Sequence, residues 1–399
     1  MMKNLTVKLE KALLKKTLLS AILLCALCRD AGASFAEPRS RVIFIGDIMA
    51  HKEQIEGARR ADGWNFRPQF LRVKPLFSDA LIVGNLETVF AGEKRGFAGY
   101  PSFNTPDSLA DALVDLGVSI LTLANNHILD RGEAGAFRTL QVLESAGILW
   151  TGLSDAGAGA DDVLLVDYAG LRWAFVAGSY GSNRPSESRD VRLHTTSNEE
   201  VLRRLENARL ASPDLVVAYF HWGEEYRYTP TKRQRELAAL CVENGADLVI
   251  GSHPHVLQPV EVVSSDRGHH LIAWSLGNFV SYQRTPPRER SCLLAVDVER
   301  SGDGGVHISR VSVAPTRVSA TKPQGRHLIE VVYAGESERF NHAGLSLQEL
   351  RTARNAGRAV LEFLGAAGSA DAEGFYTLWD VRSPDAVPKG RRRTPESPE

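Results

Sequence analysis

The feature that most restricts the fold of this chain is an alternation of short apolar runs with helical segments, repeated five times. The apolar runs occupy residues 41–45, 80–83, 118–123, 214–220 and 246–250, and the helical segments occupy 53–61, 106–116, 132–146, 198–210 and 231–244. Apolar runs this short, bounded by turn residues, predict buried strands. Strands that alternate with helices predict an α/β layered core around a largely parallel sheet.

The pattern changes after residue 256, where strands follow one another with only short turns between them. We expect these strands at residues 256–263, 269–276, 292–299 and 306–314, with turns at 266–268 and 302–305. An earlier pair, 161–168 and 171–177, has the same hairpin pattern. Strands joined by tight turns pair antiparallel, so we predict mixed sheets and a second sheet packed on the first.

The two ends of the chain differ in composition from the part between them. A basic region, an apolar run at 17–27 and small residues up to Ala36 predict a secretory signal peptide over 1–36, or alternatively an uncleaved anchor. We therefore expect an exported protein, periplasmic or extracellular, or one anchored through its N-terminus. A main domain over 41–315 should precede a strand-and-helix extension over 316–382 and a disordered tail over 383–399.

Charge and cysteine content exclude some classes of function. The formal net charge of −1 gives no indication of nucleic-acid binding. Removal of residues 1–36 would leave two cysteines, Cys241 and Cys292. They could form a disulfide in an oxidising compartment, or they could be two small buried apolar side chains.

Each of the five predicted parallel strands ends in polar side chains. These are Asp47; Asn85 with Glu87; Asn125, Asn126 and His127 with Asp130; His221 with Glu224; and His253 with His255. Any one of them could be an ordinary turn or helix cap. Carboxyl ends of parallel strands meet at one edge of a sheet, so together they predict a site.

The residue types at these strand ends indicate a metal site. Carboxylate, amide oxygen and imidazole are ligands that suit divalent Mn, Fe or Zn. Because the cluster contains no cysteine, a structural zinc-thiolate or iron–sulfur site is disfavoured. Six or seven candidate ligands exceed the need of one catalytic zinc and suit a two-metal site.

Six motifs in order give the chain a resemblance to a known family. They are GDIM at 46–49, GNLET at 84–88, LANNH at 123–127, HWGEEY at 221–226, GSHPHV at 251–256 and SLGNF at 275–279. Together they resemble the CapA family of poly-γ-glutamate capsule biosynthesis proteins, which is similar to the calcineurin-like metallophosphoesterases. The resemblance covers about residues 41–300 and implies a four-layer α-β-β-α sandwich of metallophosphoesterase type.

The resemblance also implies roles for individual residues. Asp47 and His255 would bind a first metal ion, and Asn126, His221 and His253 a second. Glu87 would lie where a carboxylate bridges the two ions. His127 would act near the substrate as general acid or electrostatic stabiliser, and we place Asp130 with it in the catalytic group. Glu224 could orient His221.

Two positions depart from the metallophosphoesterase pattern. Met49 stands where that superfamily has a histidine, and a thioether is a poor ligand for a hard metal site. His51 lies two residues further on, but the sequence does not define which way its side chain points. Asn85 stands where the bridging aspartate is expected, although Glu87 could compensate. Both departures weaken the first metal position, so a one-metal site or a non-hydrolytic binding site is an alternative.

Two functions remain open from the sequence. The first is a metal-dependent hydrolase, with one or two divalent ions, acting on a phosphoester or another polar bond of a cell-envelope molecule. The second is a non-enzymatic envelope protein that assists synthesis, binding or export of an anionic polymer such as poly-γ-glutamate, with membrane-embedded capsule synthesis proteins as partners. Arg184 and Arg189 in a long polar loop could hold an anionic substrate or simply be solvated.

Overall fold

The computed structural model describes residues 40–155, 163–185, 191–302, 304–337, 340, 343–366 and 368–383, all within the compact unit Ser40–Glu399. The predicted signal peptide and nearly all of the predicted tail lie outside these residues. The helices are α2 (Lys52–Ala58), α3 (Ser108–Leu116), α4 (Gly132–Ala146), α5 (Asn198–Leu210), α6 (Lys232–Glu243) and α7 (Leu347–Leu364). Short 3-10 turns lie at Arg67–Gln69, Lys74–Phe77, Glu93–Arg95 and Pro323–Gly325.

Two mixed sheets form the core of this unit. The first has the order β18-β17-β16-β1-β4-β5-β6, with β15 beside β1 and β19 beside β17. Its strands are β1 (Ser40–Ile48), β4 (Leu81–Leu86), β5 (Val118–Thr122), β6 (Leu149–Thr151), β15 (Asn278–Val280), β16 (Arg290–Arg300), β17 (Val306–Thr321), β18 (Leu328–Tyr333) and β19 (Tyr376–Asp380). Strands β1, β4, β5 and β6 are parallel, whereas β16 to β19 pair antiparallel.

The second sheet has the order β13-β14-β12-β11-β9-β8. Its strands are β8 (Leu164–Tyr168), β9 (Leu171–Ser179), β11 (Leu215–His221), β12 (Leu248–Ser252), β13 (Val260–Ser265) and β14 (Gly268–Ala273). Its four inner strands are parallel and its two edge strands are antiparallel. Two small ribbons, β2 (Arg59–Arg60) with β3 (Gly63–Trp64) and β7 (Leu153–Asp155) with β10 (Val191–Leu193), complete the strands.

Strand periodicity explains why the sheets stack face to face. On β1, Val42 and Phe44 face the layer between the sheets, whereas Ile43 and Ile45 pack with α2, α3 and α4. On β11 the odd residues from Leu215 to Tyr219 enter that same middle layer. The even residues of β11 pack under α5 and α6. Because side chains alternate across a strand, each sheet is buried on both faces.

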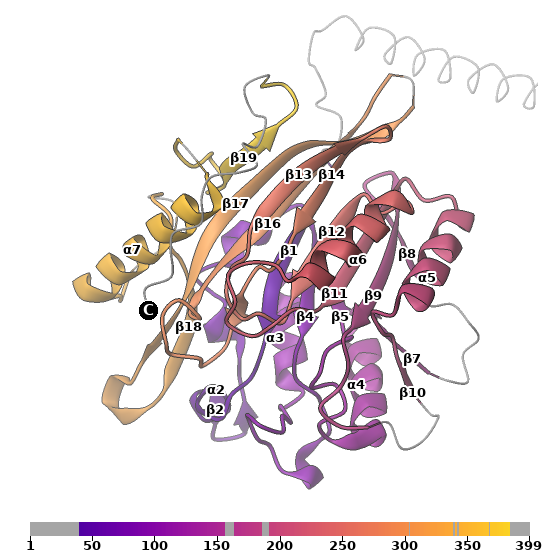
Figure 1. Ribbon diagram of the computed structural model, residues 1–399. Helices are drawn as coiled ribbons and strands as arrows, with labels where there is room; N and C mark the ends of the chain where they lie inside the picture. Colours follow the sequence, from indigo (N-terminus) through magenta and orange to yellow (C-terminus); the bar gives the residue numbers. More distant parts are fainter. Residues whose placement is uncertain are drawn as a thin grey trace, which may run out of the picture. The chain divides into compact units, whose positions relative to one another are not determined.

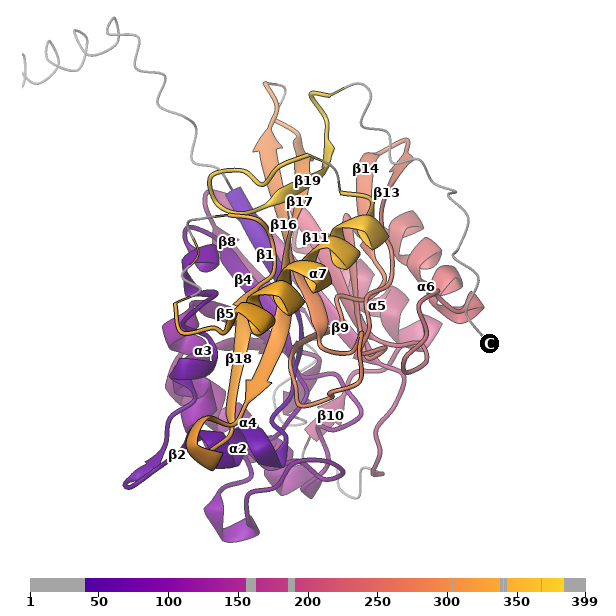
Figure 2. The same ribbon diagram turned by 90° about the vertical axis from the view of Figure 1, so that its left-hand side faces the viewer.

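The resulting order of layers is helices, sheet, sheet, helices (Figure 1). This confirms the predicted four-layer α-β-β-α sandwich with mixed sheets. The view in Figure 2 shows α7 lying across the antiparallel strands of the first sheet. No helix in the described residues combines the length and the apolar character needed to cross a bilayer.

The predicted boundary at residue 315 falls inside β17, which runs from Val306 to Thr321 without a break. Strands β18 and β19 then join the same sheet as β1. The buried Arg41 guanidinium on β1 donates to Asp297 at 2.7 Å and also pairs with Glu373. The described residues of segment 316–383 therefore extend the first sheet. Strand pairing continues along the chain beyond the last of the six motifs.

Candidate metal centre

The strand ends bring the predicted polar residues to one place between the two sheets. Asp47 ends β1 and Glu87 follows β4, whereas His221 ends β11 and His253 follows β12. All four are buried. The two sheets thus contribute opposite walls of one centre, at the carboxyl edge where α/β folds place their sites.

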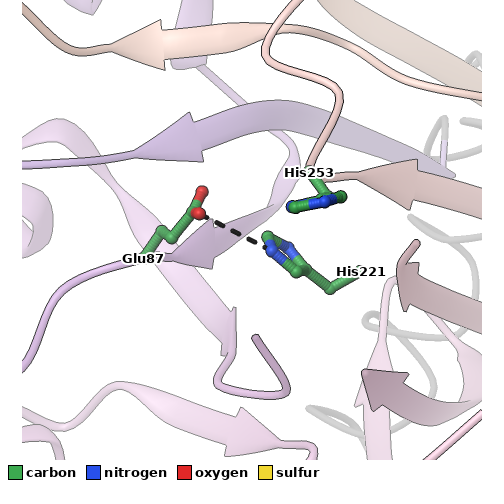
Figure 3. A group of neighbouring side chains, drawn as sticks. All are labelled: Glu87, His221 and His253. Atoms are coloured by element: carbon green, nitrogen blue, oxygen red, sulfur yellow. Dashed lines mark ion pairs between the residues drawn. The ribbon is translucent and has the colours of Figure 1, made fainter. Parts of the chain in front are cut away.

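Three groups of side chains present ligand atoms within 4.8 Å of one another, as a metal ion requires. They are Glu87, His221 and His253; Asp47, Glu87 and His255; and Glu225, His253 and His255. Figure 3 shows the first group, in which the Glu87 carboxylate and both imidazoles converge. Glu87 belongs to two of the groups and so lies between two adjacent candidate positions.

Glu87 has the environment of a cation ligand. Its side chain is fully buried, and neither carboxylate oxygen has a hydrogen-bond partner. Its Oε1 lies 3.6 Å from His221 Nε2 and 3.7 Å from His255 Nε2. Burial first, and then the charge of Asp47, raises the pKa of Glu87 well above its usual value. A divalent cation would satisfy both oxygens and favour the ionised form, so the residues present fit such an ion.

The histidines present bare nitrogens to the same space. His255 Nδ1 lies 3.0 Å from Asn278 Oδ1 and 3.2 Å from Asp47 Oδ2. Because both of these oxygens accept a hydrogen bond from Nδ1–H, the lone pair on Nε2 remains available to a ligand. His253 Nδ1 is buried without a hydrogen-bond partner. Burial lowers the pKa of His253 to about 4, so its imidazole is neutral, as metal binding needs.

His221 lies next to Asn126 across the gap between the two sheets. Its Nε2 lies 2.8 Å from Asn126 Oδ1, and its Nδ1 lies 3.0 Å from Ser252 Oγ. Burial lowers the pKa of His221 well below its usual value, and the neighbouring His253 adds to this effect. The interpretation that Glu224 orients His221 is wrong: Glu224 pairs with Arg227 at 3.0 Å on the surface, and Ser252 takes the orienting role.

Both histidines after β12 have a left-handed backbone. The φ angle is +96° at His253 and +57° at His255. Such angles cost about 1–3 kcal/mol at residues other than glycine and persist where the surrounding structure enforces them. Here the main-chain N–H of His253 donates to Asp47 Oδ2 at 3.3 Å. The loop is thereby held so that both rings join the centre.

His127 and Asp130 form a second cluster beside the candidate ligands. His127 Nδ1 lies 2.8 Å from Asp130 Oδ2, which also accepts from the main-chain N–H of Phe103 at 2.7 Å. Asn183, from the polar loop after β9, contacts both Asn126 and His127. Its Oδ1 accepts from Asn126 at 3.3 Å, and its Nδ2 lies 3.4 Å from His127 Nδ1.

One of the two departures from the metallophosphoesterase pattern, Asn85, has a structural account. Asn85 donates to Asp47 Oδ1 at 2.8 Å, and its own Oδ1 accepts from Thr122 and Asn125. Asn85 therefore positions an acidic side chain, and Glu87 brings the carboxylate to the middle of the centre. His51 joins none of the three groups found among the described residues. Its Nδ1 accepts from the main-chain N–H of Tyr282 at 3.2 Å.

Sequence reasoning missed three residues at the centre. Asn278 was part of the SLGNF motif, but only the parallel pairing of β15 with β1 places it opposite Asp47. Glu225 joins a candidate ligand group, and the exposed Tyr180 ring lies 4.7 Å from the His253 ring.

Arg184, also from the predicted anion-binding loop, is exposed, and Arg189 lies outside the described residues. Trp222 packs in the helical layer, with its Nε1 donating to Trp274 O.

Comparison with known proteins shows the family to which the chain belongs. Residues 41–283 match the family described as Bacterial capsule synthesis protein PGA_cap, and the chain belongs to that family. Capsule biosynthesis protein CapA of Bacillus anthracis is 27% identical over 70% of this chain and 68% of its own length. PGA biosynthesis protein CapA of Bacillus subtilis is 29% identical over 68% and 70%.

A solved structure is similar at lower identity. A hypothetical protein from Thermus thermophilus is 18% identical, with a TM-score of 0.41, over 69% of this chain and 98% of its own. The resemblance to the CapA family predicted from six motifs is confirmed by the family match and by the two Bacillus proteins.

Proposed function

We propose that this protein is a metal-dependent hydrolase of capsule polymer metabolism, acting on a phosphoester or another polar bond of a cell-envelope molecule. The observation that carries the proposal is Glu87, whose two buried oxygens lack hydrogen-bond partners and whose Oε1 lies within 3.7 Å of a nitrogen of His221 and of His255. Family membership and the names of the Bacillus relatives support the connection with capsule polymers.

The ligand sets follow from the groups described above. Asp47, Glu87 and His255 would hold one divalent ion, and Glu87, His221 and His253, with the Asn126 amide oxygen, would hold a second. The mixed nitrogen and oxygen donors suit Mn, Fe or Zn. A divalent cation in these positions supplies Lewis acidity to substrate oxygens and increases the acidity of water.

His127 is proposed to deliver the proton that the leaving group needs. Asp130 Oδ2 accepts a hydrogen bond from the Nδ1–H of His127 and so fixes the orientation of the ring. This leaves Nε2 of His127 to donate to a substrate atom. Because Phe103 donates its main-chain N–H to the same carboxylate, Asp130 cannot turn away from His127 without losing two contacts.

The second candidate function is a non-enzymatic envelope protein that binds an anionic polymer or assists its synthesis or export. Asn85 favours it, because a neutral amide replaces a carboxylate beside Asp47 and leaves fewer anionic ligands. Both functions are compatible with the predicted export signal over 1–36, and with capsule synthesis proteins in the membrane as partners.

The test is a measurement of metal content joined to an activity assay. We would measure Mn, Fe and Zn in the purified protein, then hydrolysis of a generic phosphoester after metal reloading. His253→Ala should reduce metal binding, whereas His127→Ala should keep the metal and reduce turnover. His269→Ala, at an exposed histidine of β14, is the matched control. Absence of both stoichiometric metal and activity in the wild-type protein would overturn the hydrolase.

A further inference from the structure

A cavity of about 350 Å³ lies beside the metal centre and shares none of its candidate ligands. The last turns of α7 form one wall, with Val360 and Phe363. Tyr228, from the loop after β11, forms another, and its ring centroid lies 6.4 Å from that of Phe363. Pro286 completes the apolar lining. The volume lies within the range of roughly 300–1,000 Å³ typical of small-ligand sites.

One cation, Arg290, lines this apolar cavity. Among the described residues its guanidinium makes no hydrogen bond or ion pair, and its Nε is buried without a partner. The acidic neighbour Glu289 is already engaged, because its carboxylate accepts two hydrogen bonds from Arg317 at 2.8 and 3.1 Å. Arg284 also lies 3.5 Å from Glu289. The positive charge of Arg290 is therefore available to an anionic ligand.

The cavity and the metal centre are linked by two neighbouring pairs of residues. Arg288 lies 3.4 Å over the ring of Tyr226, and that ring lies 6.1 Å from the His255 ring. Two residues further along each segment, Arg290 and Tyr228 line the cavity. The Arg288 guanidinium also has no acidic partner among the described residues. Two arginine side chains, Arg288 and then Arg290, therefore follow one another from the metal centre to the cavity.

We propose that this cavity binds one acidic unit of a linear polyamide chain, with its carboxylate on the guanidinium of Arg290. Forked hydrogen bonds from arginine suit a carboxylate, and the rings of Tyr228 and Phe363 suit flat amide groups and short methylene stems. Arg288 then holds the next carboxylate on the way to the metal centre. Only this last placement rests on the proposed hydrolase, because binding in the cavity requires no metal ligand.

The test is a calorimetric titration of the metal-stripped full chain with a γ-linked glutamate decamer. We expect Arg290→Gln to weaken binding by about ten- to a hundredfold, as loss of a charge-assisted bond predicts. Phe363→Ala should also weaken it. Arg354→Gln, on an exposed face of α7 and outside the cavity lining, is the matched control and should bind within about twofold of wild type.

Three results would overturn the cavity site. They are wild-type affinity in Arg290→Gln, equal weakening by Arg354→Gln, and equally tight binding of a linear polyphosphate, which would show a general anion surface. If Arg290→Gln does not fold, Arg290→Lys provides the comparison, since it keeps the charge and removes the fork. His253→Ala should bind the decamer as wild type does. Decamer binding by a wild-type protein that takes up no metal on reloading and shows no turnover would refute the hydrolase and leave the cavity site standing.

Discussion

Replacement of Glu87 by glutamine tests the metal centre through stability instead of activity. The substitution keeps the shape of the side chain and removes its charge. In the metal-free protein the carboxyl group of Glu87 is fully buried, with no hydrogen-bond partner for either oxygen. Leaving a neutral polar group in that state costs about 1–3 kcal/mol, and a charged one costs more, so the glutamine amide is the less costly group to bury. We therefore expect Glu87→Gln to raise the free energy of unfolding of the metal-free protein by about 1–3 kcal/mol at pH 8.

The pH dependence has a defined sign. The folded protein raises the pKa of Glu87 above its unfolded value, so the folded state binds more protons than the unfolded state does. Stability from this group is complete below the unfolded pKa and is lost as pH rises through the folded pKa. The advantage of Glu87→Gln should therefore be largest at pH 8 and shrink towards pH 5.

Metal should reverse the order of stability. Wild-type protein gains about 2.7 kcal/mol when the free ion is at a hundred times its dissociation constant. Glu87→Gln loses the carboxylate shared by both candidate positions, so it should gain much less. Thermal unfolding of both proteins, recorded in chelator and in excess Mn²⁺ at pH 5 and at pH 8, measures their stability under these four conditions.

Glu289→Gln is the matched control for this experiment. Glu289 is also buried, but Arg317 and Arg284 hold its carboxylate. Its replacement should destabilise the protein by about 1.5–3 kcal/mol with or without metal, since a charged hydrogen-bond partner is lost. The reasoning about Glu87 is refuted if Glu87→Gln destabilises the metal-free protein at pH 8, or if its effect is the same at both pH values.

Three further predictions concern the histidines and the cysteines. Asp130→Asn should reduce turnover about 10- to 100-fold while metal content stays constant, because Asp130 orients His127. In the metal-free protein His253 should contribute a loss of stability in denaturant titrations as pH falls from about 6.5 to about 4, a slope opposite in sign to that of Glu87. Burial holds the pKa of folded His253 at about 4, so the unfolded state binds more protons, and His253→Gln should flatten part of this slope. Cys241 and Cys292 are free, and burial raises the pKa of each thiol to about 12. Ellman's reagent should therefore modify them only after unfolding.

The layered fold could be predicted because local burial leaves a periodic signal in the sequence. On β1 the alternation of Val42 and Phe44 with Ile43 and Ile45 puts apolar side chains on both faces, as a sheet buried between two layers requires. The motifs at the strand ends then indicated which edge carries the site. The continuation of the first sheet past residue 315 left no such signal, because the extended strand β17 has no turn at that point.

The sequence by itself determined the layers, the edge that carries polar residues, and the family. Only the tertiary structure decided how those residues meet. Asn278 reaches His255 because β15 pairs with β1, and Ser252 instead of Glu224 orients His221. The left-handed backbone at His253 turns its ring into the centre. Such contacts join segments far apart in the chain through loop conformations, and periodicity reports only which face of a local element is buried.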